Sequence, residues 1–305
     1  MSDETTDDQL PLDLPIAAWV DAAKADPVRY RDRQVTYALL SAIGLTPELK
    51  ETMLLKGGAL MMLGFNSPRG TQDVDFTVEA DPEPFASEFA NHLNPALRRA
   101  IATLGYIDLV CRVQTIKKRP HPQIFEETPV PALTITLAHA QRGTNEEKRL
   151  NAGQAARVLQ VDLSFKEPIF NAAEARLDKP AVTIRTYALE EVIAEKLRAL
   201  LQQHERNRAR RQDVFDIAFL AETASLDADA KHKILKALIE KSAARDIDIT
   251  KSSIDLPEVA ERAASQWETL RQELEEGELP PFAEAFESVR ALYRSLPWPE
   301  EFILG

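Results

Sequence analysis

The segment Asp73-Val74-Asp75-Phe76-Thr77-Val78 alternates polar and apolar side chains along its whole length. Such alternation predicts a half-buried β-strand, because successive side chains on a strand point to opposite faces of its sheet. Asp73 and Asp75 therefore share one face with Thr77, and the apolar residues pack on the other. A chain that contains this strand must fold around a sheet with one polar face, and two aligned carboxylates on that face are a candidate metal site.

A glycine pair stands upstream of this strand, in Lys56-Gly57-Gly58. Glycine lets the backbone approach a ligand closely, and the short helix predicted to follow would present free N–H groups to an anion. We expect Lys56, Gly57 and Gly58 to bind the phosphates of a nucleotide, although a plain tight turn has the same sequence. Arg69 and Thr71, just before the strand, either contact a phosphate as well or cap the turn.

A second alternating segment, residues 157–165, carries Gln160, Asp162 and Ser164 on its polar face. Asp162 therefore has the correct parity to join Asp73 and Asp75 if the two strands lie side by side. Three carboxylates beside a phosphate cradle are typical of metal-dependent phosphoryl or nucleotidyl transfer. The alternative is that all three are merely solvent-facing strand residues in a chain with 49 acidic side chains.

From Tyr187 onward the apolar spacing is helical, and Lys196 falls on the apolar stripe formed by Leu189, Ile193 and Leu200. Its ammonium must reach either water, by extending along the surface, or a buried anion. We expect Lys196 to contact the triphosphate of a nucleotide.

Asp213 and Asp216 are spaced i, i+3 on the next predicted helix and lie on its packing face. Carboxylates on a packing face need partners, which Arg210, Lys196 or cations bound with a substrate could supply. A purely structural salt bridge to Arg210 or Arg211 is the alternative.

These patterns predict three regions: a disordered acidic tail over residues 1–15, a mixed α+β domain over 16–180 and a helical domain over 181–305. In the α+β domain we expect strands at 73–78, 107–115, 132–138 and 157–165, and helices near 35–43, 59–63 and 85–104. Residues 142–153 are predicted to form a hairpin or loop, and the Pro-containing segment 166–186 a connection.

The composition is that of an ordinary globular protein, with 44% hydrophobic and 28% charged residues among 305. The single cysteine, Cys111, lies in an apolar run and is predicted to be a small buried hydrophobe. The acidic N-terminus has no signal-peptide pattern, and no apolar run approaches the roughly 20 residues of a membrane span. We therefore expect a cytoplasmic protein without a membrane partner.

The net charge of −12 argues against broad, non-specific binding of nucleic acid. Two basic clusters, residues 117–121 and 206–211, nevertheless stand out against the acidic background. Such clusters are often only solvated surface, but either could serve as a local nucleic-acid contact.

The ordered set of motifs resembles the AbiEii/AbiGii nucleotidyltransferase toxins, which include the MenT toxins. The resemblance covers roughly residues 50–220 and rests on Lys56-Gly57-Gly58, Arg69-x-Thr71-x-Asp73-x-Asp75, Asp162, Lys196 and Arg210-x-x-Asp213-x-x-Asp216. It implies an α+β fold: a DNA polymerase beta-like nucleotidyltransferase core with a mixed sheet, followed by a helical domain that completes the active-site cleft. One departure is Gln212, where many relatives carry a basic residue.

The resemblance also implies roles for individual residues. The implied metal ligands, for Mg²⁺ or Mn²⁺, are Asp73, Asp75 and Asp162. The implied catalytic set is Asp73, Asp75, Asp162, Lys196 and Asp213. Nucleotide binding is expected at Lys56, Gly57, Gly58, Arg69, Thr71, Lys196, Arg210 and Asp216.

By this resemblance the chain is expected to be the toxin of a bacterial toxin–antitoxin or abortive-infection system. It would transfer a nucleoside monophosphate from NTP to the 3′ end of tRNA and so block translation, and a cognate antitoxin would be its protein partner. Two alternatives use the same residues: nucleotidylation of a protein hydroxyl, which the overall acidity favours slightly, and NTP binding by a sensor without turnover.

Overall fold

The computed structural model describes residues 11–299, which form two compact units. The first unit contains the chain up to Gly64, then Gln72–Glu167 and Ala173–Thr186. The second contains Phe65–Thr71, Pro168–Ala172 and the chain from Tyr187 onward. Two short segments that belong to the second unit are thus inserted into the sequence of the first.

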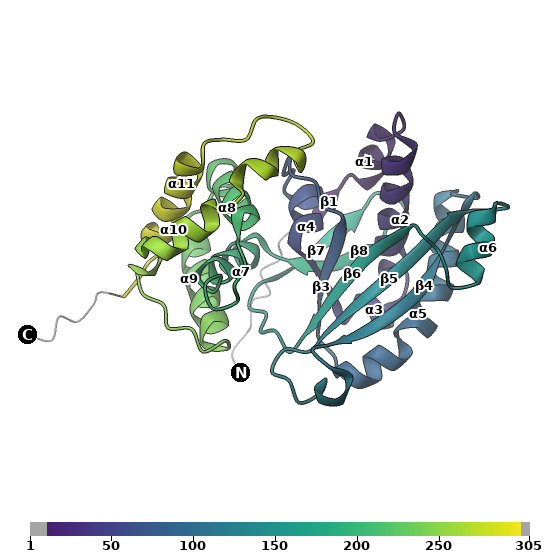
Figure 1. The fold of residues 1–305 in the computed structure, drawn as a ribbon, viewed down its shortest axis with the longest axis horizontal. Coiled ribbons are helices and arrows are strands. Elements are labelled where there is room, and N and C mark those ends of the chain that lie inside the picture. The colour runs from purple at the N-terminus through teal and green to yellow at the C-terminus, as the bar shows by residue number, and fades with distance from the viewer. Residues whose placement is uncertain (1–10, 300–305) are drawn as a thin grey trace, which may run out of the picture. The chain divides into compact units, whose positions relative to one another are not determined.

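The first unit is built on one sheet, with helices packed against it (Figure 1). Its strands are β1 (Leu12–Leu14), β2 (Met53–Lys56), β3 (Asp73–Val78), β4 (Leu109–Arg119), β5 (Ala132–Gln141), β6 (Val158–Phe165), β7 (Ala172–Leu177) and β8 (Thr183–Tyr187). Its helices are α1 (Ile16–Ala22), α2 (Pro27–Gly44), α3 (Pro47–Lys50), α4 (Gly57–Gly64), α5 (Pro82–Leu104) and α6 (Asn145–Asn151).

The sheet has the strand order β1-β7-β8-β2-β3-β6-β5-β4. Three neighbouring pairs, β1 with β7, β2 with β8 and β3 with β6, run parallel. The pairs β2–β3, β5–β6 and β4–β5 are antiparallel. The mixed sheet expected from the sequence is therefore present, and β3 and β6, which carry the predicted carboxylates, are direct neighbours.

The alternation of β3 and β6 separates a packed face from a polar one. Val74, Phe76, Val161 and Leu163 are at most 2% exposed, as the alternation predicts for the apolar residues. Helix α2 contacts β6 and helix α5 contacts β4. Burial of these apolar side chains fixes the face to which the polar residues are turned, because a slip of one residue would exchange the two faces.

Two predictions for connecting segments are wrong. The predicted hairpin or loop at 142–153 contains helix α6, which has acidic residues in its first turn and basic residues in its last. That order of charges stabilises a helix through its macrodipole, so the sequence did contain an indication of this helix. The predicted connection at 166–186 contains strands β7 and β8. In β7 only Ala175 and Leu177 are buried, and so weak an alternation does not distinguish a strand from a loop.

The predicted disordered tail is wrong at its C-terminal end. Residues 12–14 form strand β1, which pairs in parallel with β7 at Leu12–Ala175 and Leu14–Leu177. Leu14 is 1% exposed, so this short strand is held by core packing as well as by pairing. Residues 1–10, which the prediction also covers, lie outside the described residues.

Cys111 is buried on β4, as predicted, and burial raises the pKa of its thiol well above the usual range. Within residues 11–299, no helix is both long enough and apolar enough to cross a bilayer.

The second unit is helical from Leu189 onward, as the spacing predicts. Its helices are α7 (Leu189–Leu201), α8 (Arg211–Thr223), α9 (Ala228–Ala243), α10 (Pro257–Ala264) and α11 (Phe282–Ser295). Helix α7 packs on α8 and α9, and α8 also packs on α11.

A buried ion network joins the inserted segment 65–71 to these helices. The Arg69 guanidinium donates to both carboxylate oxygens of Asp216, at 3.0 Å from Nε and 2.8 Å from Nη2. Lys196 Nζ donates to Asp216 at 2.6 Å and to Asp213 at 3.1 Å. Asp216 is fully buried, and Arg69 and Lys196 are at most 8% exposed. Two cations and two carboxylates therefore balance within the interior, where an unpaired charge would be costly.

The pairing decides the charge state of both central groups. Burial alone would lower the pKa of Lys196, but the Asp216 and Asp213 carboxylates raise it above its ordinary value. Burial alone would raise the pKa of Asp216, but Lys196 and Arg69 hold it below its ordinary value. Both groups are therefore charged at neutral pH.

The other inserted segment is anchored in a similar way. Glu191 on α7 accepts hydrogen bonds from the backbone N–H groups of Phe170 and Asn171, at 3.2 and 3.0 Å. Lys241 on α9 forms an ion pair with Glu191 at 2.8 Å and donates to the carbonyl of Pro168 at 2.9 Å. Both inserted segments of the second unit are thus attached to its helices through buried charges.

Replacing Asp216 by Asn should destabilise the second unit by about 3–5 kcal/mol, because Arg69 and Lys196 would lose the carboxylate that they share. Urea unfolding followed by tryptophan fluorescence measures this change, since two of the three tryptophans, Trp267 and Trp298, lie in that unit.

The matched control is Asp229→Asn. The Asp229 side chain is 71% exposed in its pair with Lys233, so this change should cost less than about 0.5 kcal/mol. Because pairing lowers the folded-state pKa of Asp216, its contribution is present above the unfolded pKa, roughly 3.9, and is lost as pH falls below it. The free energy of unfolding should therefore fall less steeply with decreasing pH in Asp216→Asn than in the wild type. Equal losses for the Asp216 and Asp229 variants would contradict the central role of Asp216.

Candidate active site

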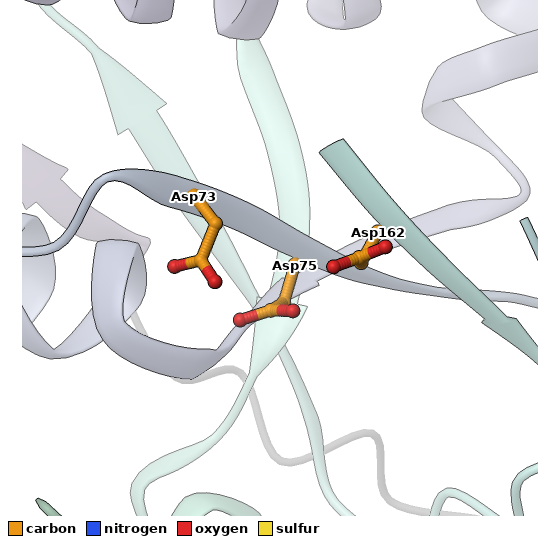
Figure 2. A group of neighbouring side chains, drawn as sticks. All are labelled: Asp73, Asp75 and Asp162. Carbon is orange, nitrogen blue, oxygen red and sulfur yellow. The ribbon is translucent and has the colours of Figure 1, made fainter. Parts of the chain in front are cut away.

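Strands β3 and β6 bring three carboxylates together on the polar face of the sheet. Asp73 and Asp75 project from the same side of β3, and the parallel register pairs Asp75 with Asp162 on β6. Figure 2 shows Asp162 beside Asp75, with Asp73 farther along the strand. Each residue offers an oxygen that lies within 4.8 Å of those of the other two, and all three side chains are partly buried. We call Asp73, Asp75 and Asp162 the acidic triad.

The glycine turn lies directly against this triad. Gly57, the first residue of α4, has φ +68°, in the left-handed region that favours glycine. A Cβ atom at this position would lie 2.2 Å from Oδ2 of Asp75, far inside van der Waals contact. Gly57 is therefore required both by its backbone conformation and by the space that the Asp75 carboxylate occupies.

Lys56, predicted to bind phosphate, belongs to a polar cluster on the same face. It is paired with Asp75 in the antiparallel register of β2 and β3. Its Nζ forms an ion pair with Glu167 and donates to Ser164 Oγ at 3.3 Å. Thr77 Oγ1 donates to the same Glu167 carboxylate at 2.9 Å. The cluster holds a neutralised lysine–carboxylate pair next to the triad.

Asp162 is held in place by side chains from three strands. Its Oδ1 accepts hydrogen bonds from Thr134 on β5 and from Arg119 on β4, both at 2.8 Å. Its Oδ2 accepts from Gln160 on its own strand, also at 2.8 Å. A carboxylate with two oxygens has about four acceptor positions, so these bonds leave room for a further partner.

Most of the remaining predicted residues form a second group, within the second unit. Lys196, Asp213, Asp216 and Arg69 make up the buried ion network described above. Arg210, the residue before α8, lies 3.6 Å from Asp213. Lys196 thus reaches a buried anion rather than water, and the main partners of Asp216 are Lys196 and Arg69. Thr71 ends the inserted segment 65–71, and Gly58 is buried in the first turn of α4.

Two neighbours of the triad were not predicted as site residues. Glu167 follows the end of β6, and only the folded sheet shows that it meets Lys56. Arg119 was noted as part of the basic cluster 117–121, but its contact with Asp162 depends on strands that are distant in sequence. Gln212, which departs from the family pattern, donates a hydrogen bond from its side-chain amide to Glu273 at 2.8 Å.

The acidic triad fits a small divalent cation. Its three carboxylates supply oxygen ligands, which Mg²⁺ and Mn²⁺ prefer, and it contains no thiolate or imidazole that would favour a softer metal. Of the neighbouring strand cations, Lys56 is paired with Glu167 and Arg119 contacts the triad at Asp162. The three carboxylates outnumber these two cations, so the triad retains negative charge.

Replacing Gly57 by Ala should displace the Asp75 carboxylate and weaken Mn²⁺ binding at least about 10-fold, as the loss of an oriented ligand does. The reference is Gly153→Ala. Gly153 also has positive φ, +73°, but within residues 11–299 nothing lies within 4 Å of an added Cβ. Both variants bear a similar backbone cost, so only the clash with Asp75 distinguishes them.

Titration of the metal-bound fraction by Mn²⁺ electron paramagnetic resonance gives the comparison directly. Similar losses of affinity in Gly57→Ala and Gly153→Ala would show that the contact between Gly57 and Asp75 does not matter for metal binding.

Comparison with known proteins agrees with this geometry. The model of the family described as nucleotidyl transferase AbiEii toxin, type IV toxin–antitoxin system, matches residues 38–291 of this chain. Among solved structures, MenT4, a nucleotidyltransferase toxin from Mycobacterium tuberculosis H37Rv, is similar with a TM-score of 0.56 and 15% sequence identity. The similarity covers 92% of this chain and 88% of that one, and at this identity it shows a shared fold. A search of curated proteins found no match.

The family match spans most of the chain and includes both the acidic triad and the buried ion network. The chain is a nucleotidyltransferase and belongs to the AbiEii toxin family of type IV toxin–antitoxin systems.

Proposed function

We propose that this enzyme transfers a nucleoside monophosphate from NTP to the 3′ hydroxyl of tRNA, in a reaction that depends on Mg²⁺ or Mn²⁺. The acceptor oxygen forms a bond to the α-phosphorus of the NTP, the bond from that phosphorus to the bridging β-phosphate oxygen breaks, and pyrophosphate leaves. The observation that carries the proposal is the convergence of Asp73, Asp75 and Asp162 on one face.

In this proposal Asp73, Asp75 and Asp162 hold the divalent metal. When bound, the metal would neutralise the triphosphate and favour ionisation of the acceptor hydroxyl. Asp162, fixed by Thr134 and Gln160, keeps its carboxylate oriented for that task. Gly57 places the start of α4 against Asp75, and the N–H groups of a helix N-terminus at this place would suit phosphate oxygens.

We assign nucleotide handling in the second unit to Lys196 and Asp213, with support from Arg69, Arg210 and Asp216. Lys196 is a cation at neutral pH and is held by two carboxylates, which suits a group that must meet a triphosphate with a fixed orientation. Asp213 is less buried than Asp216, at 8% exposure against 0%, and is the more accessible of the two carboxylates.

A nucleic-acid acceptor is supported by the loop between α7 and α8. Arg206 and Arg208 are exposed there. Partial burial and then the neighbouring charges, led by Arg245, lower the pKa of Arg206. Several guanidinium groups thus concentrate positive charge around this loop, although the protein has a net charge of −12. Local positive charge of this kind favours binding of phosphate groups.

A cognate antitoxin follows from membership of a type IV toxin–antitoxin family, and we propose that it counteracts this enzyme in the cytoplasm. The transfer assay below identifies the base of the preferred NTP.

The transfer reaction is tested by incubating the purified protein with Mg²⁺, total bacterial RNA and each labelled NTP in turn. Label on tRNA is expected, and Asp75→Asn should reduce it at least about 100-fold, because a metal ligand is lost. Asp81→Asn is the control, since Asp81 is exposed and its side chain does not cap α5. Label on protein alone would favour nucleotidylation of a protein, and no label with any NTP would favour a sensor.

The role of Lys196 is tested against a second buried lysine. Lys196→Met and Lys241→Met both remove an ammonium that is at most 8% exposed and is paired with carboxylates of the second unit. Only Lys196→Met should raise the KM for NTP, by about 10-fold or more, since charge-assisted contacts to phosphate are strong. Steady-state kinetics at a temperature where both variants remain folded makes the comparison, and equal KM values would assign Lys196 a purely structural role.

A further inference from the structure

A β-bulge turns the basic end of β4 toward the acidic triad. The register of β4 and β5 pairs Val113 with Leu137 and then Thr115 with Thr136, so Gln114 is the extra residue. Such an insertion reverses which side chains of a strand share a face. Beyond the bulge, Lys117 is paired with Thr134, which is itself paired with Asp162. Lys117 and Arg119 therefore lie on the triad face of the sheet.

Lys118, between them, is on the opposite face. It forms an ion pair with Glu83 of α5, the helix that packs against β4. The three consecutive basic residues 117–119 therefore lie on two faces of the sheet. Lys117 and Arg119 lie on the triad face, and Lys118 lies on the packed face, where it is paired with Glu83. The sequence alone shows only three consecutive basic residues.

The side chains around the triad on β4, β5 and β6 include several uncharged hydrogen-bonding groups. Thr115 and Thr136 share a hydrogen bond at 2.8 Å, and Thr134 and Gln160 both donate to Asp162. Hydroxyl, amide and guanidinium groups of this kind make most contacts to the sugars and phosphates of nucleic acids. A strand of RNA that ends at the triad has suitable partners here.

The contact between Arg119 and Asp162 is of a kind that opens easily. Arg119 Nη2 lies 2.8 Å from Asp162 Oδ1, and the two side chains are 49% and 20% exposed. Ion pairs with this much exposure contribute little stability. The pair of Arg69 with Asp216 is different, since both side chains are almost fully buried. Arg119 is therefore free to exchange one anionic partner for another.

We propose that Arg119 binds a phosphate group of the RNA acceptor and that Asp162 holds it in the metal-free protein. The inference rests on the proposed function and names a residue for its acceptor. A divalent cation among the three carboxylates would repel the guanidinium and compete with it for the Asp162 charge. Arg119 would then turn to the nearest other anion, and its planar fork suits a phosphate.

The first experiment uses metal alone. Mn²⁺ binding is measured by electron paramagnetic resonance for the wild type, Arg119→Gln and Lys118→Gln. Arg119→Gln should bind Mn²⁺ about 2- to 5-fold more tightly, because a competing cation has been removed from Asp162. Lys118→Gln removes the same charge from the opposite face of the same strand and should match the wild type. Equal affinities for all three proteins would overturn the proposal.

The second experiment uses fluorescently labelled bulk tRNA as the probe. With Mn²⁺ present, Arg119→Gln should weaken tRNA binding about 5- to 10-fold. The slope of log affinity against log salt concentration should decrease by about one, as expected for the loss of one phosphate contact. With EDTA the wild type and Arg119→Gln should bind alike, since Arg119 then remains on Asp162. Equal weakening in Lys118→Gln, or a loss that does not require metal, would refute the switch of partners.

The transfer assay separates this inference from the function on which it rests. A wild-type protein that labels no RNA would contradict the proposed function. A wild type that labels RNA, with an Arg119→Gln variant whose KM for RNA is unchanged, would contradict only the role of Arg119. At a saturating concentration of Mg²⁺, the KM for NTP should be unaffected in both the Arg119 and the Lys118 variants.

Discussion

The parallel pairing of β3 with β6 is the constraint on which the site depends. One register places Asp75 beside Asp162, and the packed faces of both strands enforce it, because a slip of one residue would turn Val74 or Val161 to water. Like charges side by side on a sheet are unfavourable, so core packing holds the carboxylates where electrostatics alone would not. The free energy of folding offsets the repulsion between the carboxylates, so the site is preorganised before a ligand binds.

Part of this arrangement can be predicted from sequence because it depends on local period. Alternation along residues 73–78 and 157–165 fixes which side chains share a face, and helical spacing places Lys196 on a packing stripe. These features need no knowledge of distant contacts. β7 and β8 could not be predicted in the same way. Their residues become strands by pairing with neighbours such as β1 and β2, and their own pattern is too weak to indicate it.

The surroundings of the triad could not be derived from the sequence either, for a different reason. Glu167 and Arg119 reach their partners across strands that are far apart in the chain, and the orientation of Arg119 also depends on the bulge at Gln114. A single inserted residue reverses the faces of a strand without any clear mark in composition. Family resemblance implied the roles of the motif residues, but it carries no information about neighbours that lie outside the motifs.

The sequence segments of the two units alternate along the chain, and this limits where the protein can be cut into independently folding fragments. The helices from Tyr187 onward share a core with Phe65–Thr71 and Pro168–Ala172, which are encoded within the first unit. A fragment starting at Tyr187 would leave Asp216 without Arg69 and Glu191 without the backbone of Asn171. Recombination between relatives at that boundary would separate Asp216 from Arg69 and Glu191 from the backbone of Asn171, while each carboxylate would keep its lysine partner. Exchange of the helical part between such toxins therefore requires that three stretches of sequence be inherited together.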